Sequence, residues 1–156
     1  MVLVPGILRL SEAVSLAMHA MVYLAASGTA TRRSAKEIAR DLRVSEHHLS
    51  KVLQRLSRAG LVVSYRGPRG GFTLARPDIT LFDVYRAIEG DLPSDDCLFA
   101  KRVCRGARCI LGSVIKDVNR DVTAHLRNTK LSDLCDVYQS SSGLEPRGPD
   151  RRSGGD

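Results

Sequence analysis

Three cysteines stand close together in this chain, and a fourth stands apart. Cys97, Cys104 and Cys109 are separated by six and then four residues, and Cys135 follows much later. Such a group is typical of a metal centre or of redox chemistry when the compartment keeps thiols reduced. Its spacing differs from the C-x2-4-C pairs of zinc fingers and from the four-cysteine runs of ferredoxins. The residues alone leave three alternatives open: an iron–sulfur cluster, a zinc ion or free reactive thiols.

Basic side chains surround these cysteines, at Lys101, Arg102, Arg105 and Arg108. Positive neighbours lower the pKa of a thiol and would offset the negative charge of a thiolate-bound metal. We therefore interpret residues 91–109 as a cysteine loop that holds an iron–sulfur cluster, a zinc ion or reactive thiols.

A second pattern with chemical meaning runs from Ser34 to Arg76. Ser34 with Glu37 forms the S-x-x-E capping box of one short helix, and Ser45 caps the next. A strand-like run LVVSYR, the turn GPRGG and a second run FTLA follow. Helix, turn, helix and hairpin in this order predict a winged helix-turn-helix, which reads double-stranded DNA.

The second helix of this motif supplies the candidate base contacts. Its buried stripe is predicted from Leu49, Val52, Leu53 and Leu56. The N-terminal turns of such a helix enter the major groove, and residues further along meet phosphates. The predicted base-reading residues are His47, His48, Ser50 and Lys51, and the predicted phosphate contacts are Arg55 and Arg58. Ser45, at the cap, is a further candidate DNA contact.

The hairpin is predicted to supply Arg66 and Arg69 at its tip, for a phosphate backbone or a minor groove. Charge agrees with this assignment. Residues 31–76 hold eleven Lys or Arg and three Asp or Glu, a net +8, whereas the whole chain carries +7. The positive field is therefore confined to one module, as expected of a phosphate-binding face.

The remaining chain is predicted to be mainly helical, so the fold class is mainly α with a small β-hairpin. Helices are expected over residues 10–26 and 80–89, which places the DNA-binding domain at residues 8–90. Val114, Val118, Val122 and Leu126 form an apolar seam, so residues 110–138 are interpreted as a long dimerisation helix of a homodimer. The Ser-, Gly- and Pro-rich residues 139–156 are predicted to be disordered.

Composition narrows the function classes. The 4% aromatic content argues against an aromatic-rich RNA platform. No apolar run reaches the roughly 20 residues that span a bilayer, and the short apolar N-terminus lacks a basic leader, so we expect a cytoplasmic protein without a membrane partner. No nucleophile–base pair, P-loop or paired-carboxylate site is visible in the sequence, which predicts a protein that is not an enzyme.

These features resemble the IscR, NsrR and RirA family of bacterial transcription regulators. The matching stretches are LRLSEAVSLAMHAMVYLA, VSEHHLSKVLQRLSRAGLVVSYRGPRGGFTLARP, the cysteine loop and LSDL, within residues 8–137. The resemblance implies a winged-helix dimer on a near-palindromic promoter site, most often a repressor, controlled by a 2Fe-2S or 4Fe-4S cluster on Cys97, Cys104 and Cys109. Two alternatives are a cluster-free thiol or zinc regulator and a small redox or cluster-carrier protein.

The fourth ligand of such a cluster is expected elsewhere in the chain. Gly112 stands where IscR-like members have a histidine ligand, and Cys135 follows a long helix. Some relatives use a carboxylate or histidine from the first helix of the partner subunit, and their carboxylate position corresponds to Ser15. On this helix His19 and Glu12 are chemically better ligands than Ser15, and we favour His19.

Overall fold

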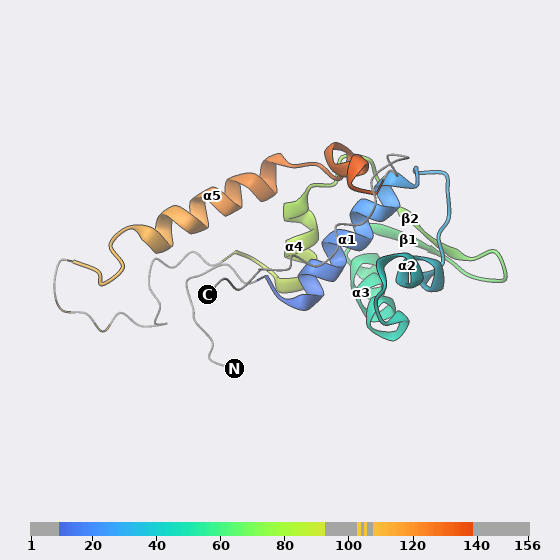
Figure 1. The fold of residues 1–156 in the computed structure, drawn as a ribbon, viewed down its shortest axis with the longest axis horizontal. Coiled ribbons are helices and arrows are strands. Elements are labelled where there is room, and N and C mark those ends of the chain that lie inside the picture. The colour runs from blue at the N-terminus through green and yellow to red at the C-terminus, as the bar shows by residue number, and fades with distance from the viewer. Residues whose placement is uncertain (1–9, 93–102, 104, 106–107, 139–156) are drawn as a thin grey trace, which may run out of the picture.

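The computed structural model describes residues 10–92, 103, 105 and 108–138 (Figure 1). Cys97, Cys104 and the predicted disordered tail lie outside these residues. The described chain is mainly helical with a two-stranded antiparallel sheet, which confirms the predicted fold class. Its elements are α1 (Glu12–Ala26), α2 (Ala35–Leu42), α3 (Glu46–Arg58), β1 (Val62–Tyr65), β2 (Gly71–Leu74), α4 (Leu81–Glu89), α5 (Val114–Asn128) and the 3-10 helix η1 (Leu131–Val137).

Helix α1 occupies the centre of the folded body. Val14, Leu16, Ala20 and Val22 are all buried, and at 100° per residue they point in several directions around the helix. The helix packs against α3 of the DNA motif, against α4 and against η1. A helix that is apolar nearly all round is typical of a buried core element, so the other helices are positioned relative to α1.

The helix-turn-helix forms as the caps predict. The Ser34 hydroxyl accepts from the Glu37 backbone N–H, while the Glu37 carboxylate accepts from the Ser34 backbone N–H. Ser45 caps α3 through the His48 backbone N–H at 3.4 Å. Between the helices, Arg43 adopts a left-handed conformation with φ of 55°. These local interactions hold the short turn, because they satisfy backbone groups that helix ends leave unpaired.

A third backbone segment, which the sequence does not predict, pairs with the two strands of the wing. Strands β1 and β2 pair with Val62 opposite Leu74 and Tyr65 opposite Gly71. Arg33, in the connection from α1 to α2, forms an antiparallel bridge to Phe72, with N–O distances of 3.1 and 2.8 Å. This bridge ties the hairpin to the chain that precedes α2.

Helix α5 is an arm that extends away from the body (Figure 1). The predicted continuous helix over 110–138 is divided in two, because Thr129 is extended and the chain pairs there with the start of α4. The Leu131 N–H donates to the Ile79 carbonyl at 2.9 Å, and Leu131 is fully buried. Backbone pairing and burial at Leu131 thus end the helix at Asn128, two residues past Leu126, the last residue of the apolar seam.

The apolar seam of α5 changes from exposed to buried along its length. Val114 is 58% exposed and Val118 is 44% exposed, whereas Leu126 is 4% exposed in the core beside α4. Ile110, just before the helix, is 90% exposed. The described residues include no helix long and apolar enough to cross a membrane.

Glycine is required at position 71 by close approach. A Cβ atom there would lie 2.8 Å from the Arg33 carbonyl oxygen, and φ is 150°. At Gly60 φ is 73° but no atom lies within 4 Å of the added Cβ. We expect Gly60→Ala to lower the free energy of unfolding by about 1–2 kcal/mol through backbone strain alone.

Gly71→Ala should lower the free energy of unfolding more than Gly60→Ala does, because the added Cβ must also break the bridge between Arg33 and Phe72. Denaturant unfolding of both variants measures the difference. Equal losses in the two variants would show that the bridge contributes nothing to the wing.

Candidate functional site

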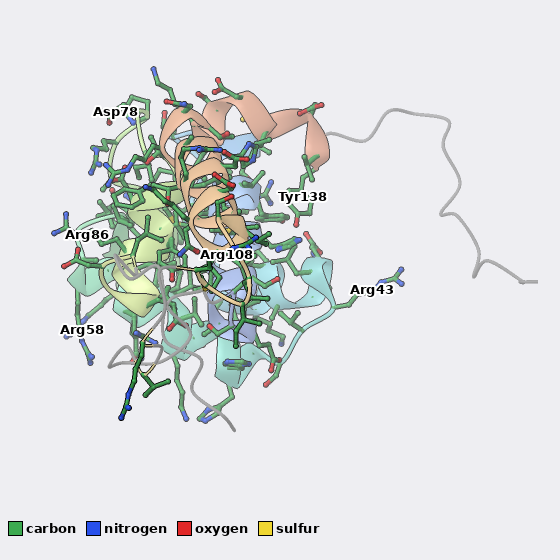
Figure 2. The ribbon with its side chains drawn as sticks, turned by 90° about the vertical axis from the view of Figure 1, so that its left-hand side faces the viewer. Arg43, Arg58, Asp78, Arg86, Arg108 and Tyr138 are labelled. Carbon is green, nitrogen blue, oxygen red and sulfur yellow. The ribbon has the colours of Figure 1, made fainter. Side chains whose placement is uncertain are left out.

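The outermost side chains of α3 form a single stripe. Helical spacing of three and four residues places His47, Lys51, Gln54 and Arg58 on one face, and all four are exposed. The buried residues Leu49, Val52, Leu53 and Leu56 lie on the opposite face against the core. In Figure 2, Arg58 extends outward at the C-terminal end of this helix. Burial of one face thus fixes which residues a DNA groove would meet.

The other predicted base contacts lie on the flanks or at the cap. His48 is half-buried, and its Nδ1 lies 3.7 Å from Oε1 of Glu12 on α1. Its ring is therefore turned toward the body rather than along the outer stripe. Ser50 lies half-buried on the other flank, and the Ser45 hydroxyl is engaged in the cap. Arg58, a predicted phosphate contact, and Gln54, which was not among the predicted DNA contacts, are better exposed than His48.

Arg55 contributes to the fold as well as to charge. Its Nη2 donates a hydrogen bond to the backbone carbonyl of Ile88 near the end of α4. The predicted phosphate contact is thus partly committed to holding α3 against α4. Only the part of its guanidinium that remains in solvent can meet DNA.

Arg66 and Arg69 are exposed at the tip of the wing. Gly67 has φ of 98°, and a Cβ at Gly70 would clash with the carbonyl oxygens of Tyr65 and Gly67. The glycines therefore permit a tight turn that carries both arginines. Beside these arginines, the guanidinium of Arg32 lies 3.9 Å from the centroid of the Tyr65 ring. Arg32 was not among the DNA contacts predicted from the sequence.

The three candidate ligands of α1 line one open groove. Glu12, Ser15 and His19 share it with His48 and Tyr138, and the cavity measures about 560 Å³. His19 Nδ1 donates to the Ser15 carbonyl at 2.7 Å. In that tautomer Nε2 carries the lone pair, which is the form that binds a metal.

Cys109 and Cys135 lie at opposite ends of the arm. Cys109 is exposed before α5, and Cys135 is half-buried on η1, where its thiol lies 3.8 Å from the Leu131 carbonyl. Helix α5 has 15 residues and is therefore about 22 Å long. Figure 1 shows α5 extended between its start and the segment η1, so within the described residues the helix separates Cys109 from Cys135.

The described residues contain one of the three predicted cysteine ligands, Cys109, together with cationic neighbours that suit a thiolate-bound cluster. Cys109 is exposed, and Arg105 and Arg108 beside it are exposed cations, with Arg108 near the start of α5 in Figure 2. No group of three potential metal ligands occurs in the part of the chain that the structure describes. The set Cys97, Cys104 and Cys109 stays a prediction, because two of its members lie outside that part.

A polar connection links α1 to α2 beside the groove. The Tyr23 hydroxyl donates to Oδ2 of Asp41 at 2.6 Å, and the Tyr23 ring packs edge-on against Tyr138 with centroids 5.8 Å apart. The Tyr23 hydroxyl, followed by the Arg40 guanidinium, holds the pKa of the Asp41 carboxyl below its ordinary value. Burial, followed by the Asp41 hydrogen bond, raises the pKa of Tyr23.

Comparison with known proteins gives one consistent family. The family model described as Rrf2, an iron-dependent transcriptional regulator, matches residues 10–137. Protein aau3 of Rhizobium meliloti (strain 1021) is 42% identical over 98 residues, which are 62% of this chain and 63% of that protein. The regulator NsrR of Geobacillus kaustophilus (strain HTA426) is 29% identical over 150 residues, which are 93% of this chain and 99% of that protein.

Solved structures give the same fold. CymR, the global cysteine regulator of B. subtilis, matches with a TM-score of 0.70 and 30% identity, over 85% of this chain and 100% of that chain. IscR of T. potens matches with a TM-score of 0.65 and 27% identity, over 89% of this chain and 93% of that chain. The family match over residues 10–137 confirms the resemblance noted from the sequence. The chain therefore belongs to the Rrf2 family of transcriptional regulators, which are not enzymes.

Proposed function

We propose that this protein is a cytoplasmic, homodimeric repressor that binds near-palindromic promoter DNA and whose affinity is set by an iron–sulfur cluster. The observation that carries the DNA-binding part is the outward stripe of α3 beside an arginine-tipped wing. Both belong to the stretch of the chain with net charge +8. Bound across a promoter, such a dimer would exclude the polymerase from the same DNA.

For DNA reading we assign His47, Lys51 and Gln54 to base edges in the major groove. Lysine pairs with guanine and glutamine with adenine, and both side chains are exposed on the same face. Arg58, Arg66 and Arg69 are assigned to phosphates, because Arg58 lies at the C-terminal end of α3 and the other two lie at the tip of the wing. His48 moves from base reading to a structural contact with Glu12.

The homodimer is supported by the exposed half of the α5 seam. Ile110, Val114 and Val118 are exposed apolar side chains on an arm, although Leu126 of the same seam is buried. A second copy, related by a two-fold axis, would cover this surface and would present two DNA modules to two half-sites.

The cluster is assigned to Cys97, Cys104 and Cys109, with His19 of the partner subunit as the fourth ligand and Glu12 or Ser15 as alternatives. The match to a family described as iron-dependent supports iron. Within one protomer His19 lies beside η1, in a second, apolar groove with Leu134 and Val137. Cys109 is at the far end of α5, so ligation by His19 requires two protomers.

When bound, such a cluster would supply redox and ligand-exchange chemistry on which a signal such as nitric oxide, oxidant or iron status could act. The rival is a cluster-free regulator that uses the same cysteines as thiols or holds zinc. The similarity to CymR, a cysteine regulator, favours keeping this rival in the test.

Substitutions should separate sequence reading from phosphate contact. Arg66→Ala and Arg69→Ala should weaken binding to every duplex, and the slope of log K against log salt should become shallower by about 0.9 for each lost phosphate contact. Lys51→Ala and Gln54→Ala should instead change the preferred sequence, at about 1–3 kcal/mol for the affected base pair.

The measurement is fluorescence anisotropy on duplexes that each protein selects from a random-sequence pool. Arg86→Ala is the matched control, because Arg86 is an exposed arginine of α4 paired with Asp91 at 3.0 Å. Parental binding by all four variants would exclude this face as the DNA-binding surface.

A charge in the α5 seam should prevent dimer formation. Val118→Asp would bury a carboxylate in the proposed interface, at a cost of several kcal/mol. We expect a monomer by light scattering and a loss of tight operator binding. Ala124→Asp, on the opposite and exposed face of the same helix, is the control and should stay dimeric. A dimeric Val118→Asp protein would place the interface elsewhere.

Anaerobic reconstitution should identify the metal and its ligands. We expect iron and sulfide in the parent, loss of the visible sulfur-to-iron absorption in Cys97→Ser, Cys104→Ser and Cys109→Ser, and a parental spectrum in Cys135→Ser. His19→Ala should change the spectrum or the stability of the cluster more than Glu12→Ala or Ser15→Ala does. A colourless protein with bound zinc, or with no metal, would support the cluster-free rival.

A further inference from the structure

The connection between α1 and α2 lies along the wing. The Arg33 backbone N–H donates to the Phe72 carbonyl, and the Arg33 carbonyl accepts from the Phe72 N–H. This bridge adds a third backbone segment beside the hairpin. The side chain of Arg33 is half-buried, and its Nε lies 3.3 Å from the Ser27 hydroxyl. The bridge therefore places Arg32, the residue before Arg33, at the wing, although Arg32 and the wing are far apart in sequence.

Arg32 is held there by an aromatic platform. Its guanidinium carbon is 3.9 Å from the centre of the Tyr65 ring, and both side chains are exposed. Gly71 is the strand partner of Tyr65 and has no side chain to interfere. Among the described residues, Arg32 forms no ion pair with a carboxylate. Its charge is thus available to a ligand.

A stacked guanidinium is well suited to bind phosphate. Stacking uses the flat face of the group, while the N–H groups around its edge stay free for two parallel hydrogen bonds to an oxyanion. The ring also restricts the side chain before any ligand arrives, which reduces the ordering cost of binding. Tyr65 directly precedes Arg66, so the stacked arginine lies next to the wing tip.

We propose that Arg32, positioned by Tyr65, is a further contact to the phosphate backbone of duplex DNA, so that the DNA-binding surface extends from the wing onto the α1–α2 connection. This inference rests on the proposed function. It assigns the ring of Tyr65 as a positioning group and leaves base reading to α3.

The test compares variants by fluorescence anisotropy across a salt series, on the duplex that the parent selects from a random pool. Arg32→Ala should weaken binding about eightfold at 0.1 M salt for each protomer that loses one phosphate contact, and the salt slope should fall by about 0.9 per protomer. Arg32→Lys keeps the charge but lacks the flat guanidinium, so its affinity for the duplex should lie between those of the parent and of Arg32→Ala.

Variants of the ring separate stacking from charge. Tyr65→Phe should bind as the parent does, because the platform remains. Tyr65→Ala should lose most of what Arg32→Ala loses, and the double variant should be no weaker than Arg32→Ala alone, as expected of two coupled residues. Thermal unfolding checks that each variant folds, and Arg86→Ala controls for loss of any exposed arginine.

The outcomes distinguish this inference from the function on which it rests. If Arg66→Ala and Arg69→Ala change the salt slope while Arg32→Ala binds as the parent does, the further contact is refuted and the wing assignment stands. If Arg32→Lys matches the parent, charge alone suffices and the platform has no role. If the parent selects no duplex at all, the proposed function itself fails.

Discussion

The burial of α1 is the constraint on which the other parts of the structure depend. Val14, Leu16, Ala20 and Val22 are buried and point in different directions, so this helix must be covered by neighbours on several sides at once. Those neighbours are α3 of the DNA motif, α4 and η1, the segment that follows the arm. One helix thus fixes the DNA module and the root of the arm relative to each other, because each element gains its apolar cover from α1.

The two faces of α3 have different roles, since one packs in the core and the other is exposed. The buried leucines and Val52 determine the rotation of the helix, and the outer stripe is the consequence. The hydrogen bond from Arg55 to Ile88 and the contact between His48 and Glu12 hold the flanks. Residues that look interchangeable in the sequence, such as His47 and His48, therefore differ in role by one helical step of about 100°.

The sequence predicts the parts that depend on local interactions. The Ser34 capping box, the Ser45 cap and the hairpin glycines each involve residues a few positions apart, and the structure confirms them. The bridge of Arg33 to Phe72 and the stacking of Arg32 on Tyr65 join segments that are remote in sequence, so no local pattern indicates them. The end of α5 was missed for a related reason. The apolar periodicity stops at Leu126 and does not show where the helix ends, whereas pairing of Thr129 to Leu131 with the start of α4 ends it at Asn128.

The connection between arm and body limits how any signal at the cysteine loop could reach DNA. The C-terminal end of α5 is joined to α4 by backbone hydrogen bonds, and η1 packs on α1 through the buried Leu131 and through Tyr138 against Tyr23. Tyr23 in turn donates to Asp41 of α2. Each contact in this series is close-packed or hydrogen-bonded, and packed elements move as units rather than deform continuously. The exposed half of α5, in contrast, has no cover within the described chain. In the proposed homodimer, a change at the distal end of the arm would therefore alter how the two protomers sit together, and with it the spacing of their recognition helices. It would do so more readily than it would alter the module proposed to read each half-site.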